Sequence, residues 1–158
     1  MFREMAKKQK QLPREDCIAL LKTQPRGVLS LQGDDGYPYG VPTNFWYCEE
    51  DGCIYFHSGQ TGHKVDSLRR SPKASVCVMD GGCRKEGDWA LTFRSVIVFG
   101  QIEILSDPQP AMDVARKLSL QFTKDMDFIE KEIKLYGHET LCFRLVPEHI
   151  TGKTIREA

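Results

Sequence analysis

The sequence predicts a mainly β fold: an antiparallel barrel of about six strands with flanking helices. Runs of alternating or β-branched residues recur along the chain, and glycine-bearing turn signals separate several of them. Hairpin links imply antiparallel pairing, because parallel strands need long crossovers. Strands of this length bury one face most simply by curling into a barrel. With 158 residues, 41% of them hydrophobic, we expect a single domain over 1–158 whose residues 1–12 form a flexible N-terminal arm.

Each element follows from a local pattern. Pro13 suits a first helical turn, and Cys17, Leu20 and Leu21 then form an apolar stripe. Gly100 interrupts a long β run, which indicates a bulge or a close backbone approach. The expected elements, in order, are a helix over 13–23, a strand over 26–32, a turn at 33–36, a strand over 37–48, a turn at 49–52, a strand over 53–58, a helix over 63–70, strands over 74–80 and 89–105, one or two helices over 108–136 with Met112, Ala115, Leu118 and Phe122 on one face, and a last strand over 141–152.

Composition excludes several classes of function. The formal net charge is zero, which does not suit an electrostatic nucleic-acid binder. No apolar run approaches the roughly 20 residues of a membrane span, and the polar start does not resemble a signal peptide. The six cysteines match no standard zinc spacing, so we expect no metal site and reduced thiols in the cytoplasm, most of them small hydrophobes on strands.

The segment SGQTGHK at 58–64 has the features of an anion site. A strand ends, glycines permit a tight turn, and a helix begins with Lys64 in its first turn. Free backbone N–H groups at the helix start, the hydroxyls of Ser58 and Thr61, and the Lys64 ammonium suit a phosphate monoester. The same residue types also occur in ordinary turns with a solvated lysine, so the segment alone leaves both interpretations open.

The segment VPTNFWY at 41–47 combines aromatic and polar side chains. Pro42 cannot donate a ladder hydrogen bond, so it marks an edge strand or an irregularity. A flat ring with polar edge atoms needs such surroundings, although a plain barrel edge would have the same pattern.

Four stretches together resemble one family. They are DGYPYGVPTNFWY at 35–47, DGCIYFHSGQTGHKVDSLRRSP at 51–72, FRSVIVFGQIEIL at 93–105 and HITGK at 149–153. In order and spacing the chain is similar to the pyridoxamine 5′-phosphate oxidase-like FMN-binding split-barrel superfamily, and within it to the nitroimidazole-resistance (Nim) type flavoproteins. The resemblance implies a six-stranded, Greek-key split barrel that binds FMN at the interface of a homodimer.

The resemblance also implies roles for individual residues. Thr61, Gly62 and Lys64 match the phosphate site, and the strand from Pro42 to Phe45 matches the one along the flavin. His57 resembles a strand-end contact to the flavin and is a candidate proton donor, although a histidine packed at a strand end is the plainer interpretation. The implied cofactor-binding residues are Pro42, Thr43, Asn44, Phe45, His57, Ser58, Thr61, Gly62, Lys64, Arg94, Ser95, Val96 and Lys153, with Arg94, Ser95 and Val96 reaching FMN from the other subunit.

Departures from the family pattern narrow the expected activity. Pyridoxamine phosphate oxidases carry an arginine at the Val41 position and a glutamine at Ser95, and they end in a substrate-binding segment that ITGKTIREA lacks. We therefore expect an FMN-dependent oxidoreductase that reduces small acceptors such as nitroaromatics or quinones, with Arg26 or Arg94 assisting Lys64 at the phosphate. A protein that holds FMN or haem without turnover is the alternative, and pyridoxamine phosphate oxidation is disfavoured.

Overall fold

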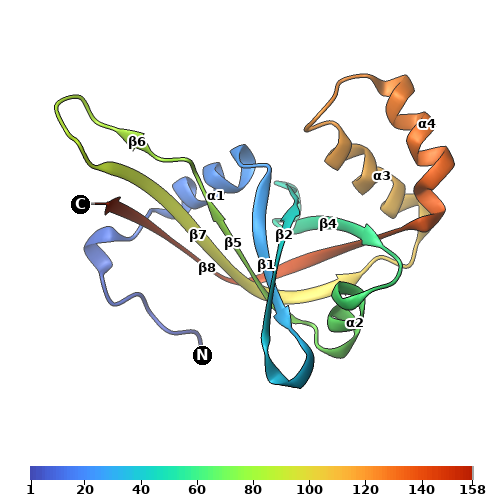
Figure 1. The fold of residues 1–158 in the computed structure, drawn as a ribbon, viewed down its shortest axis with the longest axis horizontal. Coiled ribbons are helices and arrows are strands. Elements are labelled where there is room, and N and C mark those ends of the chain that lie inside the picture. The colour runs from blue at the N-terminus through green and yellow to red at the C-terminus, as the bar shows by residue number, and fades with distance from the viewer. Residues whose placement is uncertain (158) are drawn as a thin grey trace.

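The computed structural model describes residues 1–157, and these form a curled antiparallel sheet with helices around it (Figure 1). In this part of the chain the strands are β1 (Arg26–Gln32), β2 (Pro38–Asn44), β3 (Trp46–Tyr47), β4 (Ile54–Gly59), β5 (Lys73–Met79), β6 (Cys83–Arg84), β7 (Leu91–Ile104) and β8 (Thr140–Glu157). The α-helices are α1 (Arg14–Thr23), α2 (His63–Arg70), α3 (Pro108–Ser119) and α4 (Met126–Tyr136), and short 3-10 helices cover Lys8–Lys10, Asp34–Gly36 and Gly137–Glu139. The predicted fold class is confirmed, with β3 and β6 as two-residue additions to six longer strands.

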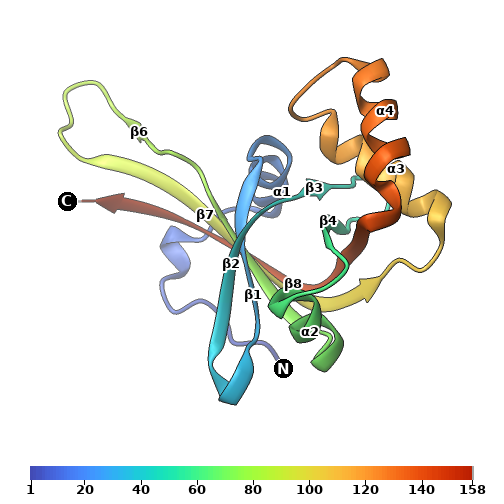
Figure 2. The ribbon, with the colours of Figure 1, turned by 45° about the vertical axis from the view of Figure 1, so that its right-hand side comes forward.

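The strand order explains how the sheet closes. Neighbours follow the path β2-β1-β5-β7-β8-β4-β3, and every pair is antiparallel. Only Phe45 separates β2 from β3, so the run 38–47 pairs with β1 along its first part and with β4 at its end. The two edges of the sheet therefore meet through one segment, as Figure 2 shows for β2 and β3. Because β5 returns beside β1, the strands have the predicted Greek-key order.

The single strand predicted over 37–48 is wrong at Phe45, where pairing changes from β1 to β4. The Phe45 side chain is 1% exposed and packs in the barrel core near Phe56, with ring centroids 6.5 Å apart. An apolar ring that turns into the core removes its residue from the ladder, and this produces the break. Pro42 lies in β2, where it is paired with Val28 on one side only, so the edge-strand prediction is confirmed.

The two longest strands, β7 and β8, pair with each other along most of their length. Their register shifts between Phe99 and Gly100, which confirms the predicted bulge. A Cβ atom on Gly100 would lie 2.1 Å from the carbonyl oxygen of Val146, so the predicted close approach is also present. The residues with the largest fully buried side chains include Phe45, Phe56, Phe143 and Leu29 of the barrel and Leu20 and Leu21 of α1, and together they form the core.

Helices α3 and α4 lie together at the end of the molecule opposite the β6 hairpin and the C-terminus (Figure 1). The apolar face predicted for this region is partly wrong. Leu118 is buried as expected, but Val114 fills the other core position, while Met112 and Phe122 are 37% and 54% exposed. The predicted helical face runs on to residue 122, whereas α3 ends at Ser119 and the chain turns away.

Other local differences are small. Pro13 occupies the position just before α1 instead of its first turn. Of the six cysteines, Cys17 lies on α1, and Cys83 is exposed on β6. The arm 1–12 contacts the barrel: Leu12 is buried, Gln11 forms a bridge to Lys153, and the Phe2 ring stacks on His149 with centroids 4.9 Å apart.

Candidate functional site

A polar hollow of about 520 Å³ opens where β1, β2, β4 and α2 meet. Strand pairing builds it, since Arg26 at the start of β1 stands opposite Asn44 at the end of β2. The lining residues, which define the polar hollow below, are Arg26, Pro42, Thr43, Asn44, His57, Ser58, Gly59 and Lys64. Six of the residues predicted from the sequence are thus brought together from β2, β4 and the first turn of α2.

The hollow has the chemistry of an anion site at its α2 end. Gly62 precedes the helix with φ of 112°, and no side chain caps the first turn. The N–H groups of His63, Lys64 and Val65 therefore have no partner within the helix, and they lie at its positive end. Lys64 is half-buried, and burial lowers the pKa of its ammonium group. A dianion beside Lys64 would relieve that burial cost, because it stabilises the charged form of the amine.

His57 lies on β4 opposite Cys142 of β8, with its ring toward the hollow. Although part of the side chain is exposed, desolvation by the surrounding protein lowers the pKa of the imidazole, and the nearby Lys64 ammonium lowers it further. The neutral imidazole is therefore favoured at neutral pH. A neutral ring can donate one hydrogen bond and accept another, which suits proton exchange with a bound ligand.

Three predicted residues near the hollow do not line it. The Phe45 side chain is a core residue, and only its backbone is close to the site; its carbonyl accepts a hydrogen bond of 2.8 Å from Gln121 Nε2. Thr61 and Gly62 are exposed in the turn before α2. Gly62 nevertheless matters, because its positive φ allows the sharp entry into the helix.

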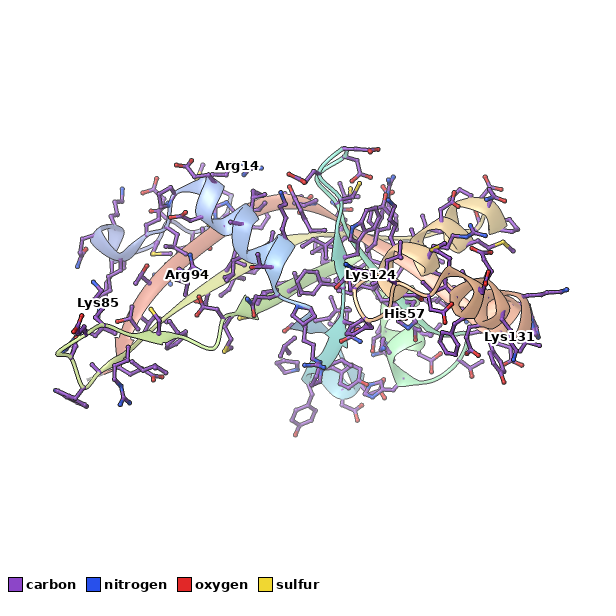
Figure 3. The ribbon with its side chains drawn as sticks, turned by 90° about the horizontal axis from the view of Figure 1, so that it is seen from above. Arg14, His57, Lys85, Arg94, Lys124 and Lys131 are labelled. Carbon is purple, nitrogen blue, oxygen red and sulfur yellow. The ribbon has the colours of Figure 1, made fainter. Side chains whose placement is uncertain are left out.

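The remaining predicted residues lie elsewhere in the same chain. Figure 3 shows Arg94 near the β6 end and His57 near the α3–α4 end. Ser95 stands opposite Lys153 on the β7–β8 ladder, and Arg94 Nε donates a 2.9 Å hydrogen bond to Asp80 Oδ2. Burial acts to raise the pKa of Asp80, but hydrogen bonds from the Arg94 N–H and guanidinium outweigh it and lower the pKa. Arg94 is therefore engaged in an ion pair within its own chain.

The Val96 side chain is fully buried in the barrel core, so only its backbone is open to a ligand, and the predicted contact stays a prediction. On β7 alternate residues point to opposite faces, so Val96 points inward where Ser95 points outward. Its backbone can still take part in contacts along the strand.

A second depression, between α3 and α4, was not predicted from the sequence. This inter-helix groove measures about 400 Å³ and shares Asn44 and His57 with the polar hollow. Residues that line it include Leu118, Phe122, Phe128, Glu132, Ile133 and Tyr136. The polar stretch TKD at 123–125 is the signal in the sequence that could have indicated it. This stretch separates two helices, so aromatic residues beside it lie at helix ends, where they are not buried in the core.

Two other kinds of feature, a membrane-spanning helix and a metal-binding cluster, were also sought among the described residues. Within residues 1–157, no helix is long and apolar enough to cross a membrane, and no group of three or more metal-ligating side chains is found.

Comparisons with known proteins agree with this architecture. A family model described as pyridoxamine 5′-phosphate oxidase matches residues 13–154. No curated protein matches the chain significantly. Among solved structures, a candidate 5-nitroimidazole antibiotic resistance protein from Bacteroides thetaiotaomicron is similar, with a TM-score of 0.76, 18% identity, and coverage of 92% of this chain and 87% of that one.

Two further structures share the fold. A protein from Mesorhizobium loti described as FAD-binding has a TM-score of 0.65 and 24% identity, with coverage of 92% of this chain and 97% of that one. A flavocytochrome from Azotobacter vinelandii has a TM-score of 0.70 and 19% identity, with coverage of 97% and 72%. At these identities the likeness establishes the fold alone.

Proposed function

Since the chain belongs to the pyridoxamine 5′-phosphate oxidase family, whose model spans residues 13–154, we propose that it is an FMN-binding oxidoreductase that reduces small acceptors such as nitroaromatics or quinones. The observation that carries this proposal is the polar hollow. It places the Lys64 ammonium, the uncapped start of α2 and a neutral imidazole around one space. Two of the similar structures are described as an FAD-binding protein and a flavocytochrome, which supports a flavin as the ligand class.

The residues of the hollow fit a flavin mononucleotide. Lys64, Arg26 and the amides that open α2 suit its terminal phosphate, because they combine two cations with free N–H donors. Arg26 supplies the guanidinium that the family arginine, replaced here by Val41, would otherwise provide. The Asn44 amide and the backbone of the edge strand β2 offer hydrogen bonds to the polar edge of a ring.

In this proposal the bound flavin supplies the redox chemistry, and the protein binds, orients and tunes it. Neutral His57 exchanges a proton with the substrate side of the site, since its lowered pKa keeps it uncharged at neutral pH. Lys64 holds the phosphate, and its positive charge lies near the His57 imidazole.

We also propose that the working form is a homodimer with FMN between two copies. Arg94, Ser95 and Lys153 lie away from the hollow of their own chain, so they would approach a ligand only from a second copy. The outer face of β7 supports this, because Ile97 and Phe99 are 38% and 39% exposed there.

The six free cysteines suit a reducing cytoplasmic setting.

A flavin titration tests the phosphate assignment. Fluorescence quenching gives dissociation constants of FMN, riboflavin and FAD for the wild type, Lys64→Ala and the control Lys73→Ala, an exposed lysine at the start of β5. A charged hydrogen bond contributes about 1.5–3 kcal/mol, so Lys64→Ala should weaken FMN about 10- to 100-fold. Riboflavin, which lacks the phosphate, should be unaffected, and Lys73→Ala should match the wild type.

The proposal would be overturned if the wild type bound no flavin, or if Lys64→Ala weakened FMN and riboflavin equally. Tighter binding of FAD than of FMN would show that the hollow does not select a phosphate monoester. Consumption of reduced nicotinamide on addition of a nitroaromatic or a quinone tests turnover. An FMN-loaded protein that reduces no acceptor would be a binding protein instead.

A further inference from the structure

The inter-helix groove is an apolar space with aromatic walls that stand open. Phe122, Phe128 and Tyr136 are 54%, 53% and 54% exposed, which is a large exposure for three aromatic side chains around one depression. The aliphatic side chains of Leu118 and Ile133 also line it. Its volume of about 400 Å³ lies within the roughly 300–1,000 Å³ typical of small-molecule sites.

The groove and the polar hollow are adjoining parts of one site. Asn44 and His57 line both spaces, so a molecule in the groove lies beside the same imidazole as a ligand in the hollow. The two spaces differ in charge. The hollow carries the cations Arg26 and Lys64, whereas Glu132 is the one charged side chain among the described residues that line the groove, with His57 favoured in its neutral form.

Glu132 is not engaged with any other charged group. It is half-buried on α4, and within residues 1–157 it takes part in no ion pair or side-chain hydrogen bond. Its neighbour Glu130 differs, because Arg116 Nη2 donates a 3.0 Å hydrogen bond to it on the outer face of the helix pair. Among the described residues Glu132 therefore places a carboxylate without an ion-pair partner at the groove wall, beside aromatic faces.

We propose that the inter-helix groove binds the electron acceptor and that Glu132 makes it select planar aromatic molecules that are neutral or cationic over anionic ones. This inference rests on the proposed function, since the acceptor would lie next to a flavin in the hollow. The aromatic walls suit a flat ring, and the negative charge favours a cation over an aromatic face while it repels a carboxylate. Glu132 acts here as a specificity residue, because it sets which molecules enter without taking part in the reaction.

Equilibrium binding of three matched probes tests the inference. They are 4-nitrobenzyl alcohol, 4-nitrobenzylamine and 4-nitrobenzoate, which are neutral, cationic and anionic versions of one ring. Calorimetry, with chemical-shift changes of groove resonances to locate the probes, is carried out on the full chain with and without FMN. We expect the wild type to bind the first two on the order of tenfold more tightly than the benzoate, as one nearby charge in a medium of intermediate polarity allows.

Variants separate the charge from the apolar wall. Glu132→Gln should strengthen benzoate binding about tenfold and leave the alcohol unchanged, while Phe128→Ala should weaken all three probes. Asp127→Asn is the matched control, because it removes a carboxylate from the same helix outside the groove and should change nothing. The inference is overturned if Glu132→Gln keeps the discrimination against benzoate, or if no probe shifts the groove resonances because a second copy covers them. A chain that binds the probes as expected but does not retain FMN would contradict the proposed function and leave the groove assignment standing.

Discussion

Replacing Gly100 by alanine should strongly destabilise the fold, because it adds a methyl group where two strands already touch. The new Cβ would lie 2.1 Å from the carbonyl oxygen and 2.9 Å from the carbonyl carbon of Val146, both backbone atoms of β8. Gly100 also pairs with Ala74 of β5 on its other side, so β7 cannot move away from β8 without disturbing a second ladder. Ordinary contact begins near 3.4 Å, so the strands would have to separate by more than 1 Å at their bulge.

The cost follows from this geometry. Overpacking in a rigid core costs about 1–3 kcal/mol, and a clash with the backbone of two central strands belongs at or above the upper end. A loss of about 3 kcal/mol in the free energy of unfolding would lower the melting temperature by about 6–12 °C in a domain of this size. Thermal and urea denaturation followed by circular dichroism measure both quantities.

Two other glycines provide graded controls. A Cβ on Gly81 would meet nothing within 4 Å, and one on Gly40 would lie 3.3 Å from a Val28 side-chain methyl, which can shift. The expected order of destabilisation is Gly81→Ala, then Gly40→Ala, then Gly100→Ala. A Gly100→Ala protein within about 0.5 kcal/mol of the wild type would refute the reasoning, because that is the range of unremarkable surface substitutions.

Three further predictions concern side chains. The His57 imidazole should titrate by NMR below its ordinary pKa of 6.5, and Lys64→Gln should raise that pKa partway, since desolvation remains when the cation is removed. Because the unfolded chain binds this proton more readily, the contribution of His57 should lower stability as the pH falls from about 6.5 through the folded pKa; an unshifted titration would contradict this. Cys83 should be the first thiol to react with Ellman's reagent, and Cys83→Ser should remove the fast phase, because burial raises the pKa of Cys53 and of Cys142 to about 11. Tyr55→Phe should cost about 1–2 kcal/mol in urea denaturation and raise the pKa of Asp51, since the phenol donates a 2.5 Å hydrogen bond to Asp51 Oδ2; a neutral effect would show that solvent replaces this bond.

Much of the fold could be predicted because it depends on local signals. Glycine-bearing turns mark the hairpins, and the alternation of residues 26–32 coincides with β1. The helix over 63–70 has the same bounds in the structure, since glycine before it and proline after it mark both ends. The break at Phe45 could not be predicted, because it depends on β4 lying across the barrel from β1, which is a tertiary arrangement.

The candidate site was predictable to a similar extent. Pro42, Asn44, Ser58 and Lys64 converge because two local motifs meet across the barrel. Apart from Asn44 and His57, the residues of the groove were not predicted, since an amphipathic pattern does not show whether an aromatic side chain such as Phe122 is buried or left open by a helix end. Family position likewise identified the segment around Val96 but not the orientation of its side chain, because the alternation of the strand decides which face each residue occupies.

The segment 38–47 has a consequence for energetics as well as for shape. It completes the ring of strands and also presents Pro42, Thr43 and Asn44 to the hollow. A ligand held there binds only when the ring is complete, so ligand affinity and ring completion must favour one another by linkage. Amide protons of β2, β3 and β4 should accordingly exchange with solvent more slowly as the ligand concentration rises. Their exchange rates would then measure how much of the protein has ligand bound.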